Sequence, residues 1–225
     1  MENERITKLR AAVKPYLTDK RYAHTLAVEQ EAAALAGIYL PEKEEKLRIA
    51  ALLHDITKKE STEKQLQMCA EFGIMVDEDA ILAPKTFHAK TAAALAARDF
   101  AAYTDEEICR GIRYHTTGRA DMTVFEAIVY LADYIEQTRT FADCVTLRQY
   151  FYSRIAKEGT ANRDIILRDT MILSFDMTIR NLMEEGGLID HDTIAARNRY
   201  VRQRLTADRP KKVCPAADRN KENAV

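Results

Sequence analysis

The sequence predicts an all-α protein, and three observations support this fold class. Alanine, leucine, glutamate, lysine and arginine dominate the 225 residues, and the chain has only seven glycines, a composition that favours helices. No segment shows the two-residue alternation of a half-buried strand, and no Asn-Gly pair marks a hairpin turn. Chemical signals for helix ends recur along the chain. Helices are therefore expected near residues 3–16, 19–37, 42–55, 61–72, 86–99, 105–115, 123–138, 143–157, 162–185 and 191–205.

Local signals place several of these helix boundaries. Gly37 followed by Pro41 suits the end of one helix and the start of the next. Gly118 is expected to break the chain between two later helices. Two pairs fit the capping box, in which a threonine before the helix is followed three residues later by a glutamate: Thr104 with Glu107, and Thr123 with Glu126.

The length of the chain fits one helical domain followed by a tail. We expect the domain to span residues 1–205. From 206 to 225 the sequence is polar and offers little to bury, so a disordered tail is expected there.

Composition also excludes several classes of function. Basic and acidic residues number 34 and 35, a net charge of −1, so no global field draws the protein to nucleic acid or to a membrane surface. No apolar run approaches the roughly 20 residues of a membrane span, and the charged segment 1–5 does not begin a signal peptide. The four cysteines form no CxxC pair, which favours a reducing compartment. A cytoplasmic protein without nucleic-acid or membrane partners is expected, and a homodimer is left open.

The histidines carry the strongest functional signal. Four of the five histidines fall, with two aspartates, in a series in which the ligands come from different expected helices, as in bundles that hold metals in their core. Neutral imidazole is the commonest metal ligand, and these groups suffice for two metal ions that share one carboxylate. The candidate ligands are His24, His54, Asp55, His88, His115 and Asp133.

The mixture of imidazole and carboxylate indicates which metals fit. It suits iron, manganese, cobalt, nickel or zinc better than magnesium or calcium. Two such ions about 3.5–4 Å apart can hold and acidify a water and stabilise an in-line displacement at phosphorus. The series therefore predicts a dinuclear site for phosphate chemistry.

A His-Asp dipeptide alone is weak evidence, because the chain contains a second one. His191-Asp192 lies in the polar segment 189–193 before an expected helix, and we interpret it as capping or surface chemistry. His54-Asp55 instead follows the apolar run 47–53. Burying this polar pair would be costly without partners, which metal ions would provide.

The order of these motifs resembles the HD superfamily of metal-dependent phosphohydrolases, whose pattern is His, then His-Asp, then a distant Asp. Here the pattern maps to His24, His54-Asp55 and Asp133, and His88 and His115 resemble the dinuclear branch. Within that superfamily the chain resembles the YqeK family, the bacterial symmetrical diadenosine-tetraphosphate hydrolases, over roughly residues 5–200. The similar segments are 21–25, 51–55, 114–118, 130–136 and 193–198. One departure is that Gln137-Thr138 follows Glu136 where family members often have proline.

The resemblance implies an HD-domain helical bundle with a dinuclear metal site in its core. Two divalent or mixed-valent ions, iron first and manganese, cobalt, nickel or zinc as alternatives, would share Asp55 as the bridging, catalytic carboxylate. The first ion would take His24, His54, Asp55 and Asp133, and the second Asp55, His88 and His115. The implied reaction is attack of a bridging hydroxide on an inner phosphorus of diadenosine tetraphosphate, which releases two ADP.

A polyphosphate substrate also requires cations and donors near the metals. Arg21, three positions before His24, and Arg139, beyond Asp133, could hold phosphate as bidentate forks, and Lys58 as a point charge. Hydroxyls and backbone N–H groups of the loop after ligand His115 could bind phosphate oxygens as well. The expected substrate contacts are Arg21, Lys58, His115, Thr116, Thr117 and Arg139. Tyr130 and Tyr134 share a face with Asp133, but such a stripe is more often core.

Three alternatives stay open at this point. Another HD phosphohydrolase could act on a guanosine alarmone, a nucleoside monophosphate or a cyclic dinucleotide. A mixed-valent di-iron oxygenase would use the same ligands, although the cationic residues argue against it. A non-catalytic nucleotide-binding module is the third, and the complete ligand set disfavours it.

Overall fold

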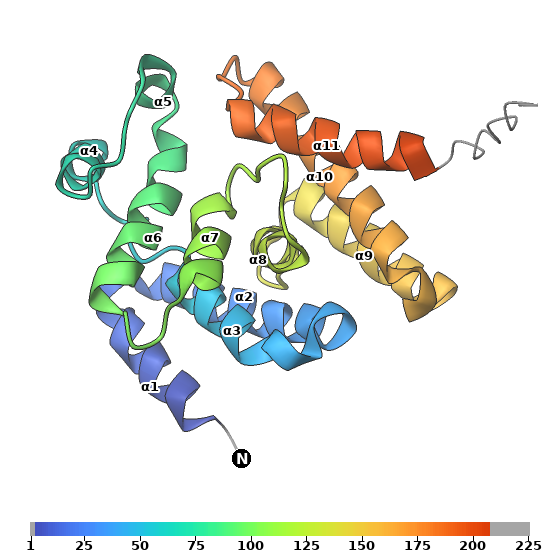
Figure 1. Ribbon diagram of the computed structural model, residues 1–225, viewed down its shortest axis with the longest axis horizontal. Helices are drawn as coiled ribbons and strands as arrows, with labels where there is room; N and C mark the ends of the chain where they lie inside the picture. Colours follow the sequence, from blue (N-terminus) through green and yellow to red (C-terminus); the bar gives the residue numbers. More distant parts are fainter. Residues whose placement is uncertain (1–2, 208–225) are drawn as a thin grey trace, which may run out of the picture.

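The computed structural model describes residues 3–207, and all of its regular structure is helical (Figure 1). The α-helices are α1 (Glu4–Val13), α2 (Asp19–Tyr39), α3 (Glu44–Leu53), α4 (Thr62–Glu71), α5 (Glu78–Leu82), α6 (Phe87–Asp99), α7 (Glu106–Tyr114), α8 (Val124–Ile135), α9 (Ala142–Glu158), α10 (Arg163–Glu184) and α11 (His191–Ala207). Short 3₁₀ helices occur at Lys14–Tyr16, Pro41–Lys43, Pro84–Thr86 and Thr160–Asn162. The all-α prediction is confirmed, and each predicted helix has a counterpart.

Several predicted boundaries differ from the structure by a few residues; the helix predicted to end at 138, for example, ends at Ile135. Two boundary signals were also wrong. α2 does not end at Gly37 but continues to Tyr39, because residues of this turn still bury apolar surface, although Pro41 opens the next helical segment as predicted. Asp105, not Thr104, caps α7 by accepting a bond from the Ile108 N–H. The Thr104 hydroxyl instead donates to carbonyls of the preceding helix end.

Two other boundary signals are confirmed. The capping box of Thr123 and Glu126 opens α8 with both reciprocal hydrogen bonds. Gly118 has φ +66°, and a Cβ there would lie 2.7 Å from the Phe175 ring. Glycine is therefore required at this turn for both conformation and space.

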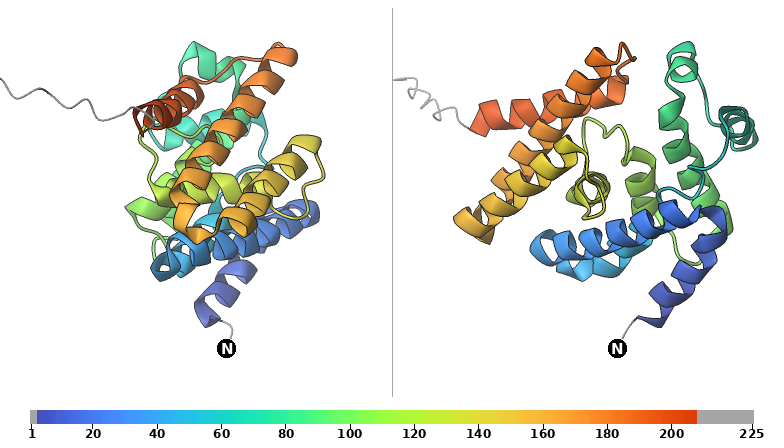
Figure 2. Two further views of the ribbon diagram at one scale, coloured as in Figure 1. Left: turned by 90° about the vertical axis from the view of Figure 1, so that its right-hand side faces the viewer. Right: turned by 180° about the vertical axis from the view of Figure 1, so that it is seen from behind.

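Helix α8 lies at the centre of the fold. Most of its side chains are buried on every face, as expected of a helix surrounded by others. It packs against α2, α3, α7 and α9. Figures 1 and 2 show α4–α6 on one side of α7 and α8, and α9–α11 on the other.

The ends of the described chain bear on two further predictions. Thr206 and Ala207, placed in the tail by the sequence, belong to α11. The rest of the predicted tail, 208–225, lies outside the described residues. Within residues 3–207, no helix is both long and apolar enough to cross a membrane.

Candidate metal centre

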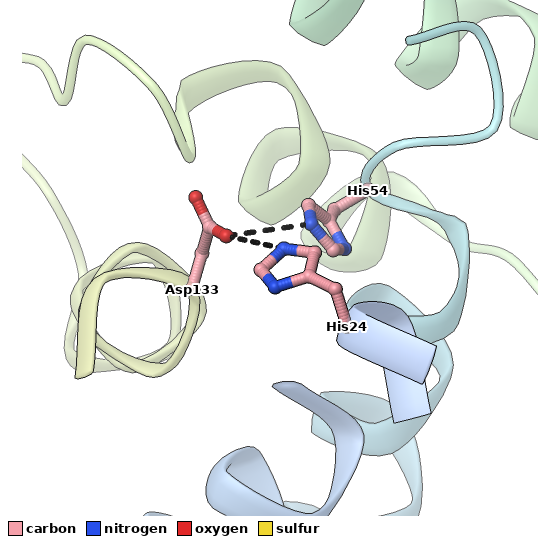
Figure 3. Close-up of side chains that lie close together, drawn as sticks. All are labelled: His24, His54 and Asp133. Atoms are coloured by element: carbon pink, nitrogen blue, oxygen red, sulfur yellow. Dashed lines mark ion pairs between the residues drawn. The ribbon is translucent and has the colours of Figure 1, made fainter. Parts of the chain in front are cut away.

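The candidate ligands converge because helix ends meet around α2 and α8. His24 lies in the second turn of α2, and Asp133 in the last turn of α8. The other ligands stand at helix ends: His54-Asp55 directly after α3, His88 at the start of α6 and His115 directly after α7. Figure 3 shows the Asp133 carboxylate facing the imidazoles of His24 and His54. The structure thus brings together every ligand that the sequence predicted.

Three of the imidazoles are oriented by their own helix ends. The Nδ1 atoms of His54, His88 and His115 lie 2.6, 2.8 and 2.7 Å from the carbonyl oxygens of the residues three positions earlier. A carbonyl can only accept, so each Nδ1 carries the proton and donates it. In the neutral ring, each Nε2 then has a free lone pair, the form in which histidine binds a metal.

Glu136 orients the fourth imidazole. Its Oε1 lies 3.0 Å from His24 Nδ1, and its carboxyl also accepts bonds from the backbone and hydroxyl of Thr138. Burial opposes the charge of Glu136, but the bonds from His24 and Thr138 outweigh it and lower the pKa of this carboxyl. A carboxylate behind a histidine fixes the tautomer and raises the basicity of the ligand. Glu136 stands three residues after Asp133, one helical turn away, but it was not among the predicted site residues.

The first half of the cluster contains His24, His54 and Asp133. Asp133 Oδ1 lies 3.0 Å from His24 Nε2 and 3.7 Å from His54 Nε2. Both Nε2 atoms are buried and have no hydrogen-bond partner among the described residues. Buried nitrogens without partners are costly, and a metal ion at their meeting point would satisfy both.

The second half contains His88 and His115. Their Nε2 atoms lie 3.1 Å apart, and the Thr116 hydroxyl lies 3.3 and 3.2 Å from them. Since both Nδ1 atoms hold the ring protons, two lone pairs face each other here. A cation is the partner that such a pair of acceptors requires, and here the Lys58 ammonium lies 3.1 Å from His88 Nε2.

Asp55 lies between the two halves. Its Oδ1 is 3.3 Å from His88 Nε2 and 3.7 Å from His115 Nε2. Its Oδ2 is 3.4 Å from His54 Nε2 and 4.0 Å from His24 Nε2. One oxygen faces each histidine pair, which is the arrangement of a bridging carboxylate.

The charges of the site reflect its burial. Burial opposes ionisation of Asp55, but His54 and the neighbouring His115 and His88 hold the pKa of this carboxyl well below its usual range. Burial also opposes protonation of His54, yet the Asp55 and Asp133 carboxylates raise the pKa of His54 to about 10. Burial lowers the pKa of His88 to about 4. Without a metal, His54 therefore holds a proton at the position where a metal ion would bind.

The predicted phosphate-binding cations all lie at this cluster. Arg21 Nη1 is 2.9 Å from Asp55 Oδ2, and Arg139 Nη2 is 2.6 Å from Asp133 Oδ1. Arg139 Nε is buried and has no hydrogen-bond partner in residues 3–207. The Lys58 ammonium lies 3.1 Å from the His88 ring nitrogens, and loss of water around it lowers the pKa of Lys58.

The two predicted threonines differ in position. Thr116 lies against the histidines of the second half, as described above. Thr117 is buried, and its hydroxyl donates to the Gly118 carbonyl at 2.9 Å. Thr117 lines a neighbouring apolar cavity with Thr116, rather than the cavities that contain the arginines.

Two cavities border the cluster. The first has a volume of about 500 Å³ and is lined by His115 and Asp133, by both tyrosines of α8, and by residues of α9 and α10. The second has a volume of about 370 Å³ and is lined by Arg21, His24 and Glu136. Arg139 and Phe141 line both. Tyr130 is a core residue, as predicted, but it also forms part of the first cavity wall.

The second His-Asp dipeptide lies apart from this cluster. His191 is exposed and begins α11, and the Asp190 carboxylate caps the turn by accepting from the Asp192 N–H at 2.8 Å. The capping here comes from the preceding residue, and the surface interpretation of His191-Asp192 agrees with the structure.

Several known proteins resemble this chain over most of its length. The chain matches the HD domain family over residues 21–138, a segment that contains every candidate ligand. It is 34% identical over 194 residues to the "Bis(5'-nucleosyl)-tetraphosphatase, symmetrical" of Bacillus subtilis (strain 168), covering 85% of this chain and 95% of that protein. A protein of the same name from Staphylococcus aureus (strain NCTC 8325 / PS 47) is 30% identical over 178 residues, covering 78% and 89%. A crystal structure of a predicted HD superfamily hydrolase involved in NAD metabolism, from Clostridium acetobutylicum, has a TM-score of 0.76 at 36% identity, covering 88% and 97%.

Proposed function

Because the chain belongs to the HD domain family, we propose that it is a metal-dependent phosphohydrolase that cleaves diadenosine tetraphosphate symmetrically into two ADP. The observation that carries the proposal is Asp55, whose two oxygens face two separate histidine pairs. The relatives named symmetrical bis(5'-nucleosyl)-tetraphosphatase, each matched over most of its length, supply the choice of substrate.

The residues at hand fit a pair of metal ions. His24, His54, Asp55 and Asp133 would hold one ion, and Asp55, His88 and His115 the other. Bound ions would acidify a water and polarise the phosphate oxygens. The imidazole and carboxylate donors favour iron, manganese, cobalt, nickel or zinc, and iron is the first metal to load.

The cations at the cluster would hold the polyphosphate. Arg21 and Arg139 each pair with a carboxylate, Asp55 and Asp133, that would serve as a metal ligand. With a metal bound, guanidinium hydrogens of both arginines would be available for phosphate oxygens. The buried Arg139 Nε already lacks a partner within the described chain. Lys58 and Thr116, next to His88, would contact phosphate on the side of the second ion.

The two cavities support a substrate with two similar ends. They meet at Arg139, beside the cluster. A molecule whose central phosphates lie at the metals can place one nucleoside on each side. This arrangement favours cleavage at the central anhydride and hence ADP as the sole product.

The test is incubation of anaerobically purified, iron-loaded protein with diadenosine tetraphosphate, with products separated by anion exchange. ADP alone is expected. AMP with ATP would contradict symmetrical cleavage, and no turnover in protein of verified metal content would contradict the proposed substrate.

Variants and competing substrates sharpen this test. His54→Ala protein that stays folded by circular dichroism should lose hydrolysis, and full activity in it would refute the metal-dependent mechanism. A panel of guanosine alarmones, nucleoside monophosphates and cyclic dinucleotides tests the related phosphohydrolases. Oxygen uptake during turnover would indicate a di-iron oxygenase instead.

A further inference from the structure

Phe141 is unusual among the aromatic side chains of the protein. Its side chain is 71% exposed, whereas every other aromatic residue between 3 and 207 is buried or half-buried. It stands in the connection between α8 and α9, immediately before α9, and provides no side-chain capping bond. Neither packing nor capping therefore accounts for a large apolar ring at this position.

The location of Phe141 relates it to the metal centre. It lines both cavities that border the ligand cluster, and Arg139, two residues earlier, also lines both. Arg139 in turn contacts the candidate ligand Asp133 at 2.6 Å. The candidate ligand Asp133, the cation Arg139 and the exposed ring of Phe141 thus lie within nine consecutive positions, 133 to 141.

The first cavity offers polar groups next to this ring. Asp143 and Asn181 line it, and Asn181 Nδ2 donates to Asp143 Oδ2 at 2.6 Å. Carboxylate and amide side chains are the groups that pair with the donor and acceptor edges of purine bases. An aromatic face beside such a polar edge is how proteins recognise unpaired bases.

We propose that Phe141 is a stacking platform for the purine base of the bound nucleotide, with the edge of that base toward Asp143 and Asn181. The inference rests on the proposed function, because it requires a nucleotide whose phosphates lie at Arg139 and the metals. Phe141, Asp143 and Asn181 all lie outside the segment 21–138 that matches the HD domain family. The base would accordingly be recognised by α9 and α10, and the phosphates by the HD segment.

A fluorescence titration tests the stacking without relying on turnover. The chain has no tryptophan, so Phe141→Trp introduces a single reporter at the proposed platform. In metal-loaded protein, ADP should quench its emission, because a stacked base contacts the indole directly, whereas inorganic pyrophosphate, which lacks a base, should not. Ile165→Trp is the matched control, since Ile165 is 45% exposed and lines neither cavity.

Equal quenching by pyrophosphate and ADP, or equal quenching in the Ile165→Trp protein, would overturn the inference. If the wild-type protein hydrolysed no dinucleoside tetraphosphate, the proposed function would fail, but the ADP titration would still decide whether Phe141 stacks on a base. The two failures are therefore distinguishable.

Steady-state kinetics give an independent measurement. Stacking of a base on an aromatic side chain changes affinity by roughly 5- to 150-fold, so Phe141→Ala should raise KM for diadenosine tetraphosphate within this range. The value of kcat should change much less, because the contact is present in both ground and transition states. Phe141→Tyr should restore KM, and an unchanged KM in Phe141→Ala would refute the platform.

Discussion

The chain contains the dipeptide His-Asp twice, and the two copies differ in every physical respect. His54 and Asp55 follow the apolar helix α3 and are 0% and 2% exposed. His191 and Asp192 begin α11, where the histidine is exposed and the aspartate half-buried. The pKa of Asp55 lies well below its usual range, whereas burial and the charge of Asp190 raise the pKa of Asp192.

This difference teaches that the dipeptide acquires its chemistry from its partners. Asp55 meets Arg21 and four imidazoles contributed by α2, α3, α6 and α7. Burial and the like charge of Asp190 raise the pKa of Asp192 by more than the nearby cations Arg113, Lys90 and Arg119 lower it. A polar His-Asp pair can be buried only where opposite charges or metal ions compensate it. In the described chain, the cluster around α8 provides such compensation for His54-Asp55.

The largest expected contrast comes from the same substitution in both copies. Asp55→Asn removes the charge of the bridging carboxylate and should lower hydrolysis on the order of 1000-fold, because several kcal/mol of metal-supplied charge stabilisation are lost. Asp192→Asn should leave hydrolysis unchanged. Rates and metal content per chain, measured on both purified proteins, check the contrast, and comparable losses in the two would contradict it.

The anchoring of the imidazoles is the second difference. In the cluster around Asp55, the Glu136 carboxylate accepts a hydrogen bond from Nδ1 of His24. The His191 side chain has no such partner within the part of the chain that the structure describes. Glu136→Gln can still accept a bond but loses the charge, and should reduce metal affinity or activity by about 10- to 100-fold. Chelator competition measures the affinity. A His191→Ala protein serves as the control and should match the wild type.

The third difference concerns protons. Metal-free His54 has a pKa of about 10, so at neutral pH it holds a proton that a metal ion must displace. Metal affinity should therefore rise about tenfold per pH unit between pH 6 and 9 for each proton displaced. His88, with a pKa of about 4, is already neutral over this range and adds no further dependence. Chelator competition across this range measures the slope, and a flat profile would show that His54 is neutral before the metal binds.

The smallest effect concerns stability. Folding raises the pKa of Asp192 above 3.8, its value in the unfolded chain. The ionised side chain therefore destabilises the folded protein at pH values above the raised pKa. This loss of stability disappears as the pH falls toward 3.8. Asp192→Asn should therefore increase the free energy of unfolding at pH 7 by a few tenths of a kcal/mol, a small value because the group is half-exposed. Urea denaturation of both proteins at pH 7 and pH 4 tests this: the gain should be present at pH 7 and absent at pH 4.

Much of the fold followed from local sequence signals. The helix positions were predictable because alanine-rich amphipathic segments with capping residues specify helices locally. The short helix Glu78–Leu82 and the 3₁₀ turns were missed, since such brief elements carry too few residues to show a period. The error at Thr104 arose because two capping residues, Thr104 and Asp105, are adjacent. The Thr104 hydroxyl bonds to the preceding helix end, and Asp105 accepts the capping bond.

Some residues of the candidate site could be predicted from the sequence, and others could not. The candidate ligands could be proposed from the sequence because histidine and aspartate at such intervals have few other uses, and the structure brings these side chains together. Glu136 and Phe141 were not found, because their roles depend on what lies opposite them in space. Glu136 is a buried carboxylate only because α2 brings His24 against it, and the exposure of Phe141 is a property of the folded surface.

The helix-end carbonyls that hold His54, His88 and His115 have a consequence for how the site is filled. Each bond joins residues three positions apart, so the side-chain conformational entropy of these candidate ligands is lost when the local turns form, before any ion arrives. An incoming ion therefore has few rotamers left to order. Ions with similar donor preferences would then replace one another without rearrangement of the chain, and the ion that occupied the proposed site in a cell would follow the available supply of each metal.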